Sequence, residues 1–274
     1  MGSYSNQAVS NYIQGLRAWH ILHRLNWLPN DLELSTILKS AAKIAPAQSK
    51  RTLREPITVE LLVRIGTVLD ITNPLDASVW ACLTTTFYTA ARLGETTVKN
   101  LTAFDPSIHI KPSDVRAVQD RGGLEMTEFR LPRTKVSMAG EAISWAAQDG
   151  PSDPNAAFEN HLRVNNPPGD QHLFAYQHQG SYRPLTKRKF LECLSSAAKA
   201  VREKVQHGHS IRIGATLEYL LRGIPFDVVK AKGRWAGDSF TLYLRKHAQV
   251  MAPYMQANPE AHLNLARIAM PPPR

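Results

Sequence analysis

The sequence predicts a mainly helical protein with one small antiparallel β-sheet, an α+β fold. Two observations predict it. Apolar side chains recur at helical spacing over most of the chain, but after residue 104 they form short stretches separated by the turn sequences KPSD, DRGG and MAGE. Apolar residues make up 43% of the 274 positions, which is enough for one large core or two modest ones. The composition is therefore that of a globular protein.

The first part of the chain, residues 1–50, predicts two helices. SNYIQGLRAWHILHRLNW, from residue 10, places apolar residues on one side of a helix, and DLELSTILKSAAKI predicts a second helix after a Leu-Pro break. The segment APAQSKRTLREP is polar, basic and bounded by prolines. It predicts a linker, which we place at residues 51–57.

The main body is expected to begin at Thr58, a candidate N-cap for the helix VELLVRIGTVLD. DASVWACLTTTFYTAARLGE then predicts one long buried helix. SIHI, DVRAV, EMTEFRL and EAISWA predict three or four strands of the sheet. Further helices are predicted at 153–165, 186–206, 209–222 with Gly223 as its stop, 225–232, 237–247 and 258–269.

Composition also restricts the class of protein. A net charge of +10 and 33 basic against 23 acidic residues are typical of proteins that contact polyanions. Cys82 and Cys193 lie among apolar residues, which predicts core thiols and a reducing, intracellular compartment. The start of the sequence has no basic region followed by an apolar run, and no stretch approaches the length of a membrane span. Secretion and membrane insertion are therefore not expected.

Several familiar sites are missing from the sequence. It contains no Walker or dinucleotide-type glycine loop and no G-x-S-x-G elbow. His207 and His209 could share a metal ion, but no further ligands are spaced to join them, so a metal site is not expected.

A scattered set of cations remains as candidates for chemistry. In AARLGE, Arg92 and Glu95 stand three positions apart at the end of a predicted buried helix, where a charged pair needs a reason to be present. Lys135 lies in or just after a turn between two predicted strands. In HSIRIGA, His209 and Arg212 stand at i and i+3 near a helix amino terminus, which attracts anions.

Two aromatic residues complete this set. Trp235 in GRW supplies an indole N–H donor, and Tyr243 follows eight positions later. Gly214 and Ala215 are small enough for another segment to approach closely. Each residue of the set also has an ordinary structural interpretation when taken alone: a salt bridge, a solvated turn lysine or a packing aromatic side chain.

Taken in order, Arg with Glu three later, a hairpin Lys, H-x-x-R, Trp and Tyr resemble the active site of the tyrosine recombinases. The sequence most resembles the recombinases of eukaryotic crypton-type mobile elements, through RAWHILH, REPIT, AARLGE, LPRTKVS, HSIRIGATLEYLLRG, GRW and FTLYLRKHA. The resemblance implies a catalytic domain at 58–274, preceded by a helical core-binding domain at 1–50 that clamps DNA. Only the last two helices of the family's larger bundle fit there. Either this domain is reduced, or the chain begins partway through it.

The resemblance implies cleavage of the DNA backbone without a cofactor or a metal ion. Arg92 and Arg212 would bind the nonbridging phosphate oxygens, because planar guanidinium groups match phosphate geometry. Trp235 would donate its indole N–H to the same phosphate. The positive charge of the arginines would do what Mg²⁺ does in other enzymes.

The resemblance also assigns the proton transfers. Tyr243 would attack phosphorus and form a 3′-phosphotyrosyl bond, with His209 as its base or proton partner. Lys135 would protonate the departing 5′-oxygen. Glu95 would orient and charge-balance His209 or an arginine without touching the substrate.

The 5′-hydroxyl of another strand could reverse the cleavage step and join new partners, so the resemblance implies strand exchange. The implied partners are double-stranded DNA and further copies of this chain, as a tetramer on two DNA sites in which a C-terminal helix passes to a neighbour. Residues 258–269 could be that helix, or a helix docked on its own domain. The implied location is nuclear.

Contacts with the DNA backbone outside the site are expected from RTLR and YRPLTKRK, two basic runs with no obvious acidic partner. Solvated basic faces are the ordinary alternative. The residues concerned are Arg51, Arg54, Arg183, Lys187, Arg188 and Lys189.

Two other functions remain open at this stage. A catalytically silent DNA-binding protein derived from such an element would have no physical reason to keep a costly cluster of cations. A type IB topoisomerase shares the Arg, Lys, Arg, His and Tyr chemistry, but REPIT, GRW and the short length favour a recombinase.

Overall fold

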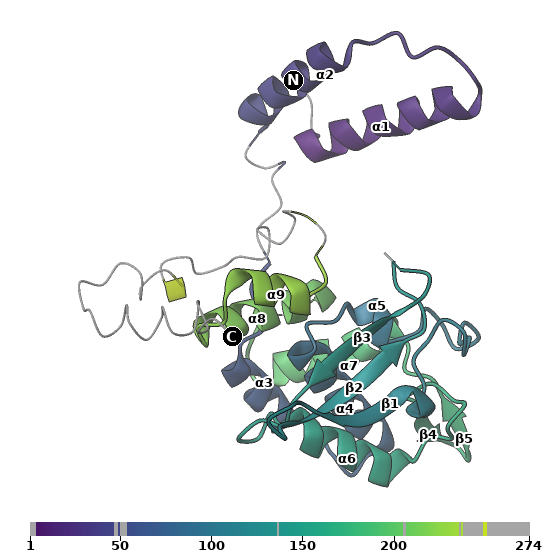
Figure 1. The fold of residues 1–274 in the computed structure, drawn as a ribbon, viewed down its shortest axis with the longest axis vertical. Helices are drawn as coiled ribbons and strands as arrows, with labels where there is room; N and C mark the ends of the chain where they lie inside the picture. The colour runs from purple at the N-terminus through teal and green to yellow at the C-terminus, as the bar shows by residue number, and fades with distance from the viewer. Residues whose placement is uncertain are drawn as a thin grey trace. The chain divides into compact units, whose positions relative to one another are not determined.

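The computed structural model describes residues 4–46, 49, 54–135, 137–204, 207–235, 237 and 249–250. The chain divides into two compact units, Met1–Leu53 and Arg54–Arg274. Figure 1 shows both. Arg51, Tyr243 and, apart from residue 237, the last two predicted helices lie outside the described residues.

The first unit contains the two helices that the sequence predicts, α1 (Asn6–Leu22) and α2 (Asp31–Ile44). The α1 helix begins earlier than expected because the hydroxyl of Ser5 accepts a hydrogen bond from the amide of Ala8 at 3.3 Å. The Arg17 guanidinium binds the Asp31 carboxylate at 2.9 Å and joins the two helices. No residue of either helix is buried.

The second unit is built around α4 (Pro74–Tyr88), in which residues 77–88 are all buried. Around it pack four of the helices: α3 (Val59–Gly66), α6 (Pro154–Asn165), α7 (Lys187–Ala200) and α8 (Gly208–Leu221). The predicted cap of α3 is confirmed, because the Thr58 hydroxyl accepts a hydrogen bond from the amide of Leu61 at 3.3 Å.

The prediction of one continuous helix over 76–95 is wrong. The α4 helix ends at Tyr88, Ala90 has a left-handed φ of +51°, and a separate short helix, α5 (Leu93–Thr96), follows. The threonines in this stretch donate their hydroxyl protons to carbonyls one turn back, for example Thr86 to Cys82 at 2.6 Å and Thr89 to Thr85 at 2.7 Å. Such side-chain bonds compete with the helical backbone and favour a break.

The predicted small antiparallel sheet is confirmed, with strand order β1-β2-β3. Its strands are β1 (Val115–Gln119), β2 (Glu125–Leu131) and β3 (Glu141–Trp145). Figure 1 shows the sheet on one side of the helical body. Phe129 pairs with Ile143 across β2 and β3, and both side chains are buried in the core. The sheet therefore places the turn between β2 and β3 at a fixed position.

A fourth strand at SIHI, residues 107–110, is not formed. The carboxylate of Asp105 accepts hydrogen bonds from the amide of Ser107 at 2.8 Å and from its hydroxyl at 2.6 Å. This side-chain-to-backbone bond makes a turn there and removes the residues from the sheet. The short helix η2 (Pro112–Asp114) leads from it into β1.

A second hairpin was not predicted. It consists of β4 (Tyr176–His178) and β5 (Ser181–Arg183), which are joined by Gln179 and Gly180. Both central residues have positive φ, +49° and +77°, as the preferred two-residue hairpin turns require.

The last helices end where local signals stop them. The α7 helix ends at Ala200, six residues before the predicted 206, and Arg202 has a left-handed φ of +57°. Gly223, with φ +79°, stops α8 as predicted. The α9 helix (Phe226–Lys232) follows, with Gly233 as its C-cap.

The two cysteines differ in burial. Cys82 lies fully buried in α4, and burial raises the pKa of its thiol to about 12. Cys193 is half-buried and packs against the core. Within the described ranges, no helix combines the length and apolar character that crossing a membrane requires.

Candidate active site

The first site arginine is positioned by α5. Arg92 is the N-cap of this helix, and its backbone amide donates to the Glu95 carboxylate at 2.8 Å, while its Nη1 donates to the other carboxylate oxygen at 2.9 Å. Burial alone would raise the pKa of Glu95. The charges and hydrogen bonds of Arg234 and Arg92 nevertheless hold this pKa below its ordinary value. The carboxylate is therefore ionised and accepts two hydrogen bonds from Arg92, one from its backbone amide and one from its side chain.

Buried hydroxyl groups anchor α5 on the end of α4. The hydroxyls of Thr86 and Thr96 are hydrogen-bonded to each other at 2.8 Å. The hydroxyl of Thr97 donates to the carbonyl of Leu93 at 2.6 Å. All three threonines are buried, so these bonds are protected from water. The break in the predicted helix thus creates a rigid support for Arg92.

The α8 helix brings the H-x-x-R pair, His209 and Arg212, to the same place. Its first residue, Gly208, packs so closely on α5 that an added Cβ would lie 2.7 Å from Leu93 Cδ2. Further along, a Cβ on Gly214 would lie 2.8 Å from the carbonyl carbon of Ile57. The predicted close approach of another segment to Gly214 is therefore confirmed, and that segment is the one that precedes α3.

The second arginine, Arg212, is held by the segment after α9. It is only 2% exposed, and its Nη2 donates to the carbonyl of Gly233. The Arg212 guanidinium carbon also lies 4.2 Å from the centre of the Trp235 ring. A side chain on Gly233 would overlap that ring, so any other residue there would displace Trp235 from its place against Arg212. The structure therefore shows Trp235 packed against Arg212.

His209 lies among cations. Its pKa is lowered first by partial burial and then by the positive charges of Arg54, Lys187, Arg212 and Arg92. The imidazole is consequently neutral near pH 7 and can accept a proton. Arg54 and Lys187, which the sequence suggests as DNA contacts, thus lie within electrostatic range of the site.

Lys135 lies in the turn between β2 and β3, as predicted, with its side chain exposed. The turn is shaped by two hydrogen bonds between Thr134 and Ser137: the Thr134 amide donates to the Ser137 carbonyl at 2.9 Å, and the Ser137 amide donates to the Thr134 hydroxyl at 3.1 Å. Lys135 therefore lies between two residues, Thr134 and Ser137, that are hydrogen-bonded to each other.

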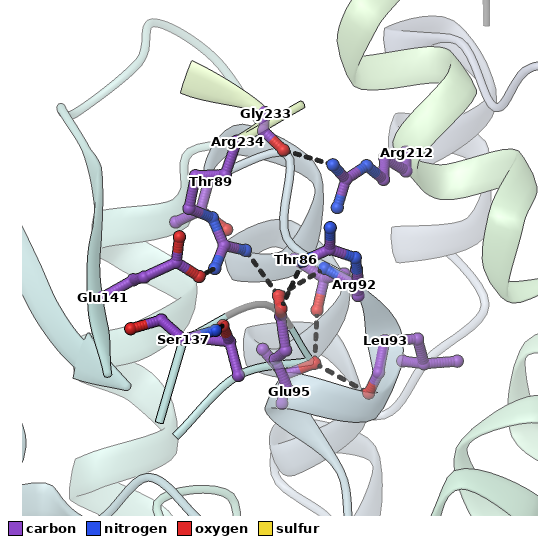
Figure 2. A network of polar contacts seen from close by, with 12 residues as sticks. Thr86, Thr89, Arg92, Leu93, Glu95, Ser137, Glu141, Arg212, Gly233 and Arg234 are labelled. Atoms are coloured by element: carbon purple, nitrogen blue, oxygen red, sulfur yellow. Dashed lines mark hydrogen bonds and ion pairs between the residues drawn. The ribbon is translucent and has the colours of Figure 1, made fainter. Parts of the chain in front are cut away.

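Sequence analysis missed Arg234 and Glu141. Arg234 has a left-handed φ of +56°, and its guanidinium binds Glu95 at 2.5 Å and Glu141 at 2.9 Å, as Figure 2 shows. The prediction left open whether Glu95 balances His209 or an arginine. Among the described residues its partners are the two arginines, Arg92 and Arg234. The only sequence signal for Arg234 is its position next to Trp235 in GRW, and only Trp235 was predicted to belong to the site.

The basic run YRPLTKRK does have an acidic partner, contrary to the prediction. Arg188 Nε lies 2.8 Å from a carboxylate oxygen of Glu192, one turn further along α7. Arg183 ends β5, while Lys187 and Lys189 lie in the first turn of α7. In the part of the chain that the structure describes, no group of three or more His, Cys, Asp or Glu side chains could hold a metal ion.

The arrangement as a whole is suited to binding an anion beside a base. Arg92 and Arg212 come from α5 and α8, and further cations approach from the segment before α3 and from the start of α7. Guanidinium groups favour phosphate or carboxylate oxygens. The neutral His209 imidazole is the group that could accept a proton there.

Comparison with known proteins bears on the fold. No protein-family model matches the chain, and no curated protein matches its sequence. The chain is similar to a crystal structure of XerA recombinase, with a TM-score of 0.51 and 14% identity over 93% of this chain and 85% of that one. An FLP recombinase–Holliday junction complex matches with a TM-score of 0.47 and 14% identity over 86% of this chain and 57% of the other.

An Flpe–Holliday junction complex gives a TM-score of 0.47 and 14% identity over 89% of this chain and 54% of that one. The chain thus spans little more than half the length of these Flp chains. The similarity in fold is therefore taken from the XerA structure, which has the higher TM-score. The mainly helical chain with its small antiparallel sheet therefore has a fold that resembles the catalytic domains of tyrosine recombinases.

Proposed function

We propose that this protein cleaves and rejoins DNA strands through a covalent 3′-phosphotyrosyl intermediate on Tyr243, in the site-specific recombination or transposition of a crypton-type mobile element. The observation that carries the proposal is the convergence of Arg92, Arg212, Arg54 and Lys187 around a neutral His209. Such a cluster of like charges disfavours the free protein and is suited to an anionic substrate.

Phosphate binding is the first step of the proposed mechanism. Phosphodiester hydrolysis is among the slowest uncatalysed reactions, and enzymes accelerate reactions of this kind by about 10¹⁷-fold or more. Arg92 and Arg212 bind the nonbridging oxygens and neutralise the charge that develops on them. In phosphoryl transfer an arginine of this kind contributes about 10³- to 10⁵-fold in rate. Replacing either arginine is therefore expected to abolish nearly all cleavage activity.

Proton transfer is the second step. The Tyr243 oxygen attacks phosphorus as its proton passes to His209, and the bond from phosphorus to the 5′-oxygen breaks. Lys135 protonates that oxygen, which leaves as a 5′-hydroxyl. The ordinary pKa of tyrosine is about 10, so the surrounding cations and a neutral base are needed near pH 7.

Rejoining reverses these steps with a 5′-hydroxyl from another strand, so no high-energy cofactor is consumed. We propose that the chain acts in the nucleus as a tetramer on two DNA sites and passes a C-terminal helix, residues 258–269, to a neighbour. Trp235 supports Arg212 through the ring contact at 4.2 Å and donates its indole N–H to the bound phosphate.

The test is to look for a covalent protein–DNA adduct. The protein is incubated with supercoiled and with nicked duplex DNA and analysed by denaturing electrophoresis, beside Tyr243→Phe and, as a matched control, Tyr254→Phe. The proposal predicts an adduct with the native chain and with Tyr254→Phe, and none with Tyr243→Phe. An adduct lost only in Tyr254→Phe would show that the nucleophile is wrongly assigned.

DNA binding and supercoil relaxation, measured on the same substrates, separate the other two functions. Tight, salt-sensitive DNA binding without any adduct would identify a silent DNA-binding protein. Relaxation of supercoils without strand exchange would identify a topoisomerase.

A further inference from the structure

Arg234 connects three parts of the fold that are far apart in the sequence. Its Nη2 binds Glu95 of α5 at 2.5 Å, and its Nη1 binds Glu141 at the start of β3 at 2.9 Å. Its own backbone follows α9, where φ is +56°. One planar guanidinium therefore ties a helix, a strand and the segment that leads toward Tyr243 to one another (Figure 2).

The pair with Glu95 is largely removed from water. The side chains of Arg234 and Glu95 are 9% and 7% exposed, and that of Glu141 is 23% exposed. Burying an ion pair costs desolvation free energy, and well-packed apolar residues often stabilise a fold as well or better. A contribution to stability alone therefore does not explain why these charges are present.

The residues on either side of Arg234, Gly233 and Trp235, both contact Arg212, the second arginine of the candidate site. The carbonyl of Gly233 accepts a hydrogen bond from Arg212, and the Trp235 ring lies 4.2 Å from its guanidinium carbon. Holding Arg234 in place thus holds both of these contacts. At the other end, Arg234 binds the carboxylate that grips Arg92.

We propose that Arg234, braced by Glu141, is a positioning residue that aligns Arg92 and Arg212 on one phosphate. The inference rests on the proposed function and deepens it. Arginine suits this role because its two Nη atoms reach two carboxylates at once, whereas a lysine ammonium is a single point charge. We expect Arg234 not to bind DNA directly, because each of its Nη atoms binds a carboxylate and its Nε is buried.

The test uses a substrate that traps the cleaved state. A pool of duplexes with randomised central sequence carries sulfur in place of the bridging 5′-oxygen, so the released thiol rejoins poorly and the adduct accumulates. Four variants of the full chain are compared with the native protein: Arg234→Gln, Arg234→Lys, Glu141→Gln and the double variant of the first and third. Arg64→Gln is the matched control, because Arg64 forms an ion pair of 2.5 Å with Glu203 between distant elements on an exposed surface.

Arg234→Gln is expected to form the adduct about 10²-fold more slowly at saturating protein, a loss that misplacement of a reacting group by about 1 Å can produce. Its DNA affinity and the dependence of that affinity on salt should be unchanged. Glu141→Gln should show a smaller loss, and the double variant should be no slower than Arg234→Gln, because Glu141 acts through Arg234. Arg234→Lys should recover only part of the rate.

The pH profile gives a measurement that general destabilisation would not change. Among the residues that the structure describes, the charged groups that face Glu95 are Arg92 and Arg234, with Glu141 beyond Arg234. Without Arg234, burial of Glu95 is opposed by Arg92 alone, so the pKa of Glu95 rises. As the pH is lowered, the rate of adduct formation should therefore begin to fall at a higher pH in Arg234→Gln than in the native protein, Glu141→Gln or Arg64→Gln.

Each contrary outcome has a distinct meaning. If the native chain forms no adduct, the proposed function fails and the inference falls with it. If the native chain reacts and Arg234→Gln matches Arg64→Gln in rate and pH profile, the inference alone is wrong. A reduced salt dependence of DNA binding in Arg234→Gln would also overturn it, because Arg234 would then be a direct phosphate ligand.

Discussion

Replacement of Gly214 by alanine tests the close packing of α8 against the backbone of Ile57. An added Cβ would lie 2.8 Å from the Ile57 carbonyl carbon, 3.0 Å from its nitrogen and closer still to its oxygen. Backbone atoms cannot move aside individually, so the contact between α8 and the segment before α3 must open. Overpacking of this kind costs about 1–3 kcal/mol, and a backbone clash belongs at the upper end.

Alanine also favours a helix over glycine by about 1 kcal/mol, which leaves a net loss near 2 kcal/mol. For a unit of this size each kcal/mol lowers the melting temperature by about 2–4 °C, so Gly214→Ala is expected to melt about 4–8 °C lower. Adduct formation should fall too, because α8 carries His209 and Arg212.

The assay is thermal unfolding followed by circular dichroism, with Gly94→Ala as the matched control. Gly94 lies in α5 beside the site, and its Cβ would meet no atom within 4 Å apart from its chain neighbours and the backbone of its own helix. Gly94→Ala should melt at or above the native temperature. A Gly214→Ala protein that melts no lower than Gly94→Ala would refute the close contact with Ile57.

Three further predictions concern protons. Lys135→Ala should cleave ordinary DNA very slowly but recover on the 5′-sulfur substrate, because a thiol, with a pKa of about 8.5, leaves without an acid; equal defects on both substrates would refute the role of Lys135. Because partial burial and nearby cations lower the pKa of His209, the native cleavage rate should be half-maximal at a lower pH than an ordinary histidine base would give, and the residual rate of His209→Gln should lack this pH dependence; a midpoint at or above the ordinary histidine value of about 6.5 would contradict the assignment. Burial lowers the pKa of His161 to about 4 and that of His172 to about 3, so the unfolded state takes up protons first and stability should be lost as the pH falls from 6.5, by about 1.4 kcal/mol per pH unit for each residue. Urea unfolding between pH 7 and 5 measures this slope, which His172→Gln should reduce; an unchanged slope in that variant would contradict the lowered pKa of His172.

Local signals in the sequence predict much of the helical framework. Thr58 caps α3 and Gly223 ends α8, as predicted. The break after Tyr88 was missed because a run of apolar residues predicts a continuous helix, whereas the threonine hydroxyls compete with its backbone. The second hairpin was missed because strands of three residues carry little periodicity.

In the candidate site, too, some residues could be predicted from the sequence and others could not. Arg92, Glu95, His209 and Arg212 were identified by residue type and order, and the structure brings them together. The ion pair of Arg234 with Glu141 joins residues 93 positions apart, and nothing in a single sequence signals it. The pair of Arg188 with Glu192, by contrast, was visible at i and i+4.

The most direct test of the central claim is the identity of the residue bonded to DNA. The trapped adduct is digested with nuclease and trypsin, and the modified peptide is identified by mass spectrometry. The account predicts a nucleotide on WAGDSFTLYLR, residues 235–245, in which Tyr243 is the only tyrosine. A nucleotide on the peptide of residues 247–267, which contains Tyr254, or on any other peptide would contradict it.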